Sequence, residues 1–148
     1  MKIAVFGAAG MVGRRVVAEA LARGHSLTAV TRDPDRAAPF PEAVALCRGD
    51  ATAPEEVAAI AARQDLVIAA TRPREGREAE LVAAARGLLE GAARSATRLI
   101  LVGGAGSLTA PGGKTLLVDD PRFVPAAWRP IALAGCRQLE LCLAERRA

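Results

Sequence analysis

The fold of this chain is decided by its N-terminal stretch, Lys2-Ile3-Ala4-Val5-Phe6-Gly7-Ala8-Ala9-Gly10-Met11-Val12-Gly13-Arg14-Arg15-Val16-Val17. A short apolar run stops at the first glycine, and three glycines spaced three residues apart then open a segment with helical periodicity. This order predicts a β-strand, a tight turn and an α-helix. Gly7 would permit the turn, Gly10 would let the backbone approach a diphosphate, and Gly13 would let the helix pack closely on the strand.

A glycine triplet on its own is weak evidence, because glycines punctuate many turns. Here the triplet follows a strand pattern and precedes an amphipathic helix, which is the context of a dinucleotide-binding site. The free N–H groups of the first helical turn, at the positive end of the helix dipole, would then bind the phosphates. The residues predicted to surround the diphosphate are Gly7, Ala9, Gly10, Met11, Val12 and Gly13.

The length and composition are those of an ordinary globular chain. Its 148 residues are 51% hydrophobic and 24% charged, which predicts one folded domain over residues 1–148. No apolar run approaches the roughly 20 residues that cross a bilayer, and Met1 leads directly into a strand without a signal peptide. We therefore expect a cytoplasmic protein with no membrane partner.

The net charge of +4 is carried almost entirely by arginine. A planar guanidinium suits phosphate, although a solvated, arginine-rich surface explains most of the excess. The cations form no long run and aromatic residues are few, so we expect no nucleic-acid partner.

Cysteine and histidine spacing argues against a metal site. Cys47, Cys136 and Cys142 have no CxxC spacing, and the single His25 cannot complete a ligand set with them. We expect buried, free thiols in a reducing compartment, and no metal ion.

The second predicted strand, residues 26–31, ends where such folds choose between NAD and NADP. A carboxylate at this place accepts hydrogen bonds from the ribose 2′-OH, whereas an arginine receives a 2′-phosphate. Thr31 and Arg32 occupy the strand end and favour NADP, while Asp33 next to them keeps NAD possible. The alternative is that Arg32 is a solvated loop residue.

The third predicted strand, residues 43–48, is followed by a candidate adenine-binding position. The carboxylate of Asp50, or the backbone at Ala51, could accept a hydrogen bond from the exocyclic amine, but Asp50 could equally be a turn residue. Thr52 and Glu55 have the spacing of a capping box, which predicts a helix that continues to about Arg63.

The fourth predicted strand, residues 65–70, closes with the small residues Ala69, Ala70 and Thr71. Small groups there leave room for a ribose or a nicotinamide. Arg72 begins the densest cationic cluster, residues 72–77, which could bind the diphosphate or an anionic substrate but could also be merely solvated.

A helix over residues 78–94 and a fifth strand over residues 98–102 lead to a second glycine-rich turn. The turn starts with Gly103 and Gly104, which we expect to bind the cofactor. Ser107 in this turn could donate a hydrogen bond to a substrate or to the nicotinamide amide, or could bond its own backbone. Residues 109–122 predict an irregular loop with an extended piece over 115–118, before a final helix over 130–145.

These segments together resemble the NAD(P)H-binding atypical short-chain dehydrogenase/reductases, and within them the NmrA-like and the biliverdin/flavin reductase-like proteins. The motifs that carry the resemblance span the whole chain: Lys2 to Val17, Val30-Thr31-Arg32-Asp33-Pro34, Gly49-Asp50, Ala70-Thr71-Arg72-Pro73 and Leu101-Val102-Gly103-Gly104-Ala105-Gly106-Ser107-Leu108. The resemblance implies a doubly wound Rossmann-like α/β sheet of about five parallel strands in the order 3-2-1-4-5. It also implies a pocket for the nicotinamide lined by Thr71, Arg72 and Ser107.

The sequence departs from this family in two ways. It contains no tyrosine, so the Tyr-x-x-x-Lys proton donor of the better-known dehydrogenases is absent. Relatives also continue for a further strand and a substrate-side segment. We therefore expect either an NADP-dependent reductase that passes hydride to a small conjugated or aromatic acceptor, such as a flavin, quinone or tetrapyrrole, or a non-catalytic NADP sensor. A third possibility is a folded relic without activity.

Overall fold

A five-stranded parallel sheet forms the centre of the computed structural model, which describes residues 1–37 and 39–145. The strands lie in the order β3-β2-β1-β4-β5, which confirms the expected Rossmann-like topology. Their order reverses between β1 and β4, so the loops after these two strands diverge at the carboxyl edge of the sheet. The strands are β1 (Lys2–Phe6), β2 (Ser26–Thr31), β3 (Val44–Arg48), β4 (Leu66–Ala69) and β5 (Arg98–Leu101).

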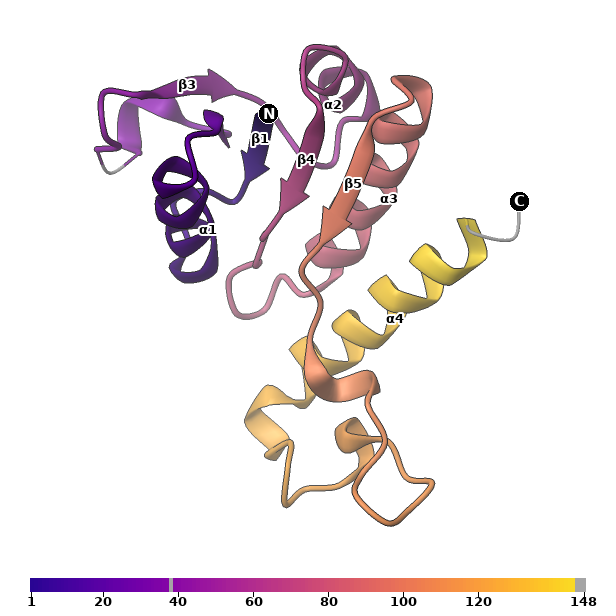
Figure 1. Cartoon of the computed structure of the whole chain (residues 1–148). Helices are drawn as coiled ribbons and strands as arrows, with labels where there is room; N and C mark the ends of the chain where they lie inside the picture. The colour runs from indigo at the N-terminus through magenta and orange to yellow at the C-terminus, as the bar shows by residue number, and fades with distance from the viewer. Residues whose placement is uncertain (38, 146–148) are drawn as a thin grey trace.

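Helices cover both faces of this sheet (Figure 1). Helix α1 (Met11–Ala22) packs on one face, and helices α2 (Pro54–Ala61) and α3 (Ala79–Arg94) pack on the other. Helix α4 (Arg129–Glu145) lies against α3 and the turn after β5. Each helix boundary falls within two residues of the sequence expectation.

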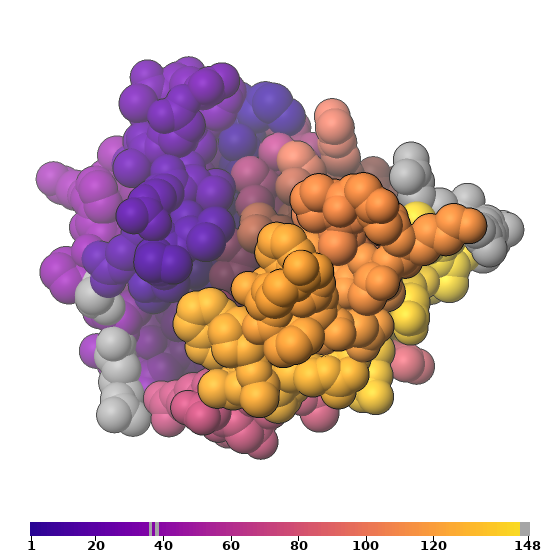
Figure 2. Space-filling model, turned by 90° about the horizontal axis from the view of Figure 1, so that it is seen from below, coloured from indigo at the N-terminus to yellow at the C-terminus, as the bar shows by residue number. Residues whose placement is uncertain are grey.

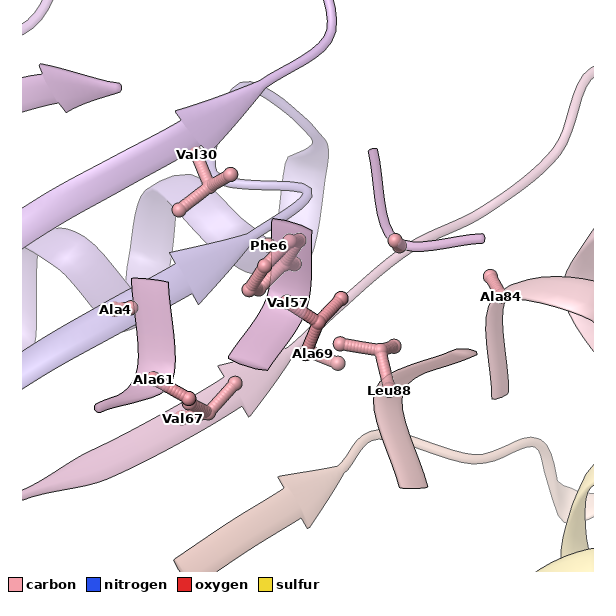
Figure 3. Packing of buried hydrophobic residues seen from close by; sticks show 10 residues of the cluster. Ala4, Phe6, Val30, Val57, Ala61, Val67, Ala69, Ala84 and Leu88 are labelled. Atoms are coloured by element: carbon pink, nitrogen blue, oxygen red, sulfur yellow. The ribbon is translucent and has the colours of Figure 1, made fainter. Parts of the chain in front are cut away.

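The central strand β1 is buried on both faces, as expected for a parallel sheet with helices on each side. Ile3 and Val5 face the α1 side, whereas Ala4 and Phe6 face the side of α2 and α3. Figure 3 shows Phe6 on the face covered by α2 and α3, together with Val57 of α2 and Leu88 of α3. Burying each of the larger side chains stabilises the fold by roughly 1.5–3 kcal/mol.

Two glycines let α3 come very close to its neighbours. A Cβ on Gly87 would lie 2.4 Å from the carbonyl oxygen of Ala51, and one on Gly91 would lie 2.6 Å from Cβ of Val57. Because both positions admit only hydrogen, α3 is held against α2 and against the loop after β3. Its first turn therefore stands at the carboxyl ends of the strands.

Residues 102–128 form an irregular segment with three short 3₁₀ helices, Ala105–Ser107, Leu117–Asp119 and Ala126–Trp128. The extended piece expected over 115–118 is reduced to one antiparallel bridge between Thr109 and Leu116. The carboxylate of Asp120 accepts hydrogen bonds from the backbone N–H and the guanidinium of Arg122, and these bonds close the following turn.

The cysteines are free, as expected, but they are half-buried rather than buried. Within residues 1–37 and 39–145, none of the helices has the length and apolar character that a membrane crossing requires.

Candidate functional site

The glycine turn after β1 has the geometry that its sequence predicts. Gly7 has φ of +76°, and a Cβ there would lie 2.5 Å from the carbonyl oxygen of Ala70. A Cβ on Gly13 would lie 2.1 Å from the carbonyl oxygen of Gly7. Both glycines are therefore required by the fold itself, because α1 and β4 meet the turn backbone directly.

Gly10 differs from these two glycines. It precedes α1 in an extended conformation, with φ of −74° and ψ of 168°. A Cβ on Gly10 would lie 3.3 Å from the carbonyl oxygen of Gly7 and 4.0 Å from that of Ala70. The missing side chain here leaves space in front of the helix start instead of avoiding a clash. This is the arrangement expected where a ligand approaches the backbone.

The start of α1 offers unused hydrogen-bond donors. The helical bonds begin with the N–H of Arg14, which donates to Gly10, and no side chain caps the helix. Among the described residues, the N–H groups of Met11, Val12 and Gly13 donate to no protein acceptor, and the Met11 side chain is exposed. Such a helix start attracts an anion through both its donors and its dipole.

A cavity of about 210 Å³ lies beside this turn, at the carboxyl ends of the strands. The end of each of the first four strands contributes to its wall, through Gly7, Thr31, Asp50 and Thr71. Figure 2 views the molecule from this end, with the orange segment around residues 105–130 standing beside the indigo N-terminal region. The cavity also contacts Ala9, Arg32, Ala51 and Arg72, all of which the sequence predicts as cofactor-binding residues.

Arg32 lies at the rim of this cavity, immediately after β2. Its side chain is 63% exposed, and its Nη1 is 3.8 Å from Oε2 of Glu80 in the first turn of α3. Thr31 accepts a hydrogen bond at Oγ1 from the N–H of Asp33, which fixes the local turn. The backbone after β2 is thus held in place, and the guanidinium lies at the cavity rim within ion-pair distance of Glu80.

The carboxylate of Asp50 is occupied by its own turn. Oδ1 accepts hydrogen bonds from the N–H and the hydroxyl of Thr52, at 2.8 and 2.9 Å. The predicted capping box is therefore wrong: Ala53 precedes α2, the Thr52 hydroxyl points to Asp50, and it is Glu56 rather than Glu55 that reaches back, to the N–H of Asp50. Local hydrogen bonds to the carboxylate of Asp50, two residues earlier, hold Thr52 in a turn ahead of the helix start.

Three residues of α3 complete the cavity, and sequence reasoning missed all of them: Glu80, Leu81 and Ala84. Leu81 and Ala84 give this wall an apolar surface, and Glu80 places a carboxylate at its rim. Gly87 and Gly91, one helical turn apart, are the sequence feature that could have indicated this wall, because two such glycines are typical of a helix face in close contact with its neighbours.

The second glycine turn serves a different part of the molecule. Gly103, Gly104 and Ser107 line a smaller cavity of about 100 Å³ together with Gln138 and Cys142 of α4. A Cβ on Gly106 would lie 3.1 Å from the carbonyl oxygen of Ala132, so this turn also provides a packing surface for α4. Burial raises the pKa of the Cys142 thiol.

The structure consequently does not bring Ser107 into one cavity with Thr71 and Arg72, contrary to the pocket that the family resemblance implies. The carbonyl group of Ala70 lies against Gly7, and Ala70 is not among the residues that line the cavity. Among the described residues, no group of histidine, cysteine, aspartate and glutamate side chains could hold a metal ion.

Comparison with known proteins agrees with this geometry. Residues 7–130 match a family model described as NAD(P)H-binding. YwnB, an uncharacterized protein of Bacillus subtilis (strain 168), is 36% identical over 134 residues, which are 89% of this chain and 61% of YwnB.

Solved structures show the same fold. A protein of Burkholderia pseudomallei described as a "putative exported protein" superimposes with a TM-score of 0.80 and 39% identity, over 95% of this chain and 65% of its own length. A "putative NADH-flavin reductase" of Streptococcus pneumoniae superimposes with a TM-score of 0.77 and 29% identity, over 98% of this chain and 67% of its own length. The chain thus spans 61% to 67% of the length of these three proteins.

Proposed function

Because the chain belongs to the NAD(P)H-binding family, we propose that it is an NADP(H)-dependent reductase that transfers hydride to a small conjugated or aromatic acceptor. The sequence motifs resemble the atypical short-chain dehydrogenase/reductases, and the solved structures similar to this chain include proteins described as a "putative epimerase" and a "putative NADH-flavin reductase". NADP in place of NAD, and the class of acceptor, are the specific parts of the proposal.

The observation that carries the proposal is the cavity at the switch between β1 and β4. Ligands of open α/β sheets bind at such a switch, outside the carboxyl ends of the strands. At about 210 Å³ the cavity is smaller than the roughly 300–1,000 Å³ of sites that enclose a whole drug-sized ligand, so it suits one half of a dinucleotide. Its apolar wall of Leu81 and Ala84 favours the adenine end.

The remaining half of the dinucleotide would extend past the start of α1. The space in front of Gly10 and the unused N–H groups of Met11 and Val12 fit a diphosphate there. In this arrangement Arg32 at the cavity rim binds the 2′-phosphate of the adenosine ribose. Thr71 and Arg72 follow strand β4, next to the central strand β1, and would orient the part of the cofactor that leaves the cavity.

Bound NADPH supplies the hydride in this chemistry. The contribution of the protein is to hold the nucleotide and to leave the nicotinamide accessible to an acceptor. With no tyrosine in the sequence, the proton that accompanies hydride comes from solvent or from the acceptor, which suits acceptors such as flavins and quinones whose reduced forms exchange protons with water. The similar S. pneumoniae protein, described as a "putative NADH-flavin reductase", supports the same class of acceptor.

A second candidate is an NADP sensor of the NmrA-like type that binds the nucleotide without turning it over. The placement of Ser107 favours it, because this hydroxyl lines the cavity against α4 instead of the proposed nucleotide cavity. Ser107 remains the predicted orienting residue of the reductase, and turnover of NADPH distinguishes the two functions.

The experiment is to incubate the purified chain with NADPH and a panel of flavins and quinones, and to follow the absorbance of the reduced nicotinamide. The reductase proposal expects acceptor-dependent oxidation of NADPH that is slower for Ser107→Ala. Measurable NADPH binding without turnover of any acceptor would refute the reductase and leave the sensor.

A further inference from the structure

Two arginines from separate loops converge on one carboxylate at the rim of the nucleotide cavity. Arg32 follows β2, Arg77 ends the loop between β4 and α3, and Glu80 lies in the first turn of α3. Nη1 of Arg32 is 3.8 Å from Oε2 of Glu80, and Nη2 of Arg77 pairs with the other oxygen, Oε1. Each carboxylate oxygen therefore faces a different guanidinium.

The three side chains differ in their exposure. The side chains of Arg32 and Arg77 are 63% and 62% exposed, whereas that of Glu80 is 27% exposed and lines the cavity. The two cations are thus more exposed than the anion, and Arg32 and Glu80 both line the cavity. Two guanidinium groups around one anion are also the arrangement with which proteins bind phosphate.

We propose that Glu80 occupies the place of the 2′-phosphate of NADP(H) in the nucleotide-free protein, and that Arg77 is a second phosphate-binding residue beside Arg32. This inference rests on the proposed function. A phosphate brought to Arg32 would lie within a few ångströms of the Glu80 carboxylate, and like charges at such distances repel each other. NADPH binding therefore exchanges one anion for the other on the two arginines, and Glu80 turns aside.

This exchange makes Glu80 a specificity-determining residue. NADP must displace the carboxylate from Arg32 and Arg77, whereas NAD, which has no 2′-phosphate, leaves the ion pairs intact. Glu80 thereby lowers the preference for NADP below what two arginines alone would give. Removing its charge should raise that preference.

A different role for Glu80 would have the opposite consequence. A carboxylate at the cavity rim could accept hydrogen bonds from the ribose hydroxyls, as an acidic residue does in NAD-specific sites. In that case the loss of the charge would weaken binding of nucleotides without a 2′-phosphate. The sign of the effect therefore separates the two roles.

The test uses Glu80→Gln and two adenosine probes, adenosine 2′,5′-bisphosphate and 5′-AMP, titrated by calorimetry into the full chain. We expect the bisphosphate to bind about threefold to tenfold more tightly to the variant, since one partly exposed like charge is removed. The affinity for 5′-AMP should stay within about twofold, because this probe does not contact the exchanged position. Arg77→Ala should weaken the bisphosphate by about fivefold and leave 5′-AMP unchanged.

Glu75→Gln is the matched control, because it makes the same charge change on an exposed residue of the loop before α3, outside the cavity lining. It should leave both affinities unchanged. Equal gains for Glu75→Gln and Glu80→Gln would reduce the effect to net charge and overturn the inference.

Three further outcomes are decisive. Weaker 5′-AMP binding to Glu80→Gln would overturn the inference in favour of a ribose contact. Unchanged bisphosphate binding in both Glu80→Gln and Arg77→Ala would overturn it as well, while wild-type binding of NADPH would leave the proposed function standing. Failure of the wild-type chain to bind NADPH and both probes would refute the proposed function, and this inference with it.

Discussion

Replacement of Gly13 by alanine tests the close contact between α1 and the turn after β1. The new Cβ would lie 2.1 Å from the carbonyl oxygen of Gly7 and 2.8 Å from Cα of Ala8, where ordinary contacts begin at 3.4 Å. All the obstructing atoms belong to the backbone, so no side chain can turn away. The helix must retreat by about 1.3 Å, which loosens the packing of Val17 and Ala20 on the sheet.

The magnitude follows from two opposing effects. Overpacking of this kind costs roughly 1–3 kcal/mol, and the better helix propensity of alanine returns up to about 1 kcal/mol. We expect a net loss of about 1–2 kcal/mol in the free energy of unfolding, and a fall in Tm of about 3–8 °C for a chain of this size. Urea denaturation followed by circular dichroism measures the first quantity, and a thermal melt measures the second.

Gly10→Ala is the matched control for this prediction. Its Cβ meets a single backbone oxygen at 3.3 Å in an extended conformation that any residue adopts, so its stability should change by less than about 0.5 kcal/mol. NADPH binding, in contrast, should be lost, because the methyl group fills the space in front of the helix start. A Gly13→Ala variant as stable as the wild type, or a Gly10→Ala variant that is equally destabilised, would refute the packing argument.

Three other predictions concern separate parts of the molecule. Arg32→Ala should weaken NADPH by about 1.5–3 kcal/mol and NADH much less, since a charge-assisted bond to phosphate is lost; equal losses in a fluorescence titration would show that Arg32 does not bind the 2′-phosphate. Hydrogen bonds from the side chain and then the backbone of Arg122 hold the pKa of Asp120 below its ordinary value, so its stabilisation is complete at neutral pH and is lost as pH falls through the lowered pKa. Asp120→Asn should therefore lower Tm at pH 7, and this difference from the wild type should shrink as pH falls below the ordinary aspartate pKa of about 3.9; a difference that stays constant down to pH 2 would contradict this. Burial raises the pKa of both Cys136 and Cys142, so iodoacetamide should label the two folded thiols only above the roughly pH 8.5 at which a free cysteine ionises. Rapid labelling of both at pH 7, read by mass spectrometry, would count against that account.

The parts of the structure that depend on local chemistry could be predicted from the sequence. Apolar runs separated by helical periods predict all five strands, and the family resemblance implies their order. The spacing of Gly7 and Gly13 indicates two backbone contacts that the structure contains. Thr31, Arg32 and Thr71 reach the same cavity because the carboxyl ends of parallel strands meet at one edge.

The parts that depend on how elements pack could not be predicted in this way. Glu80 belongs to the cavity only because Gly87 and Gly91 bring α3 close to its neighbours, and no local motif at Glu80 reports that approach. The role of the turn from Gly103 to Ser107 could not be predicted for a different reason. A glycine that makes room for a ligand and a glycine that makes room for a packed helix look the same in the sequence. Here part of the turn contacts α4. The spacing of Thr52 and Glu55 is that of a capping box, but the Thr52 hydroxyl donates to the carboxylate of Asp50, which the capping-box pattern does not include.

Calorimetric titration of the wild-type chain with NADPH, and separately with NADH, tests the central claim most directly. The cavity at the β1–β4 switch, the open start of α1 and Arg32 predict saturable binding of one NADPH per chain, with NADH binding more weakly. Absence of heat with both nucleotides, or tighter binding of NADH than of NADPH, would contradict an NADP site at this edge of the sheet.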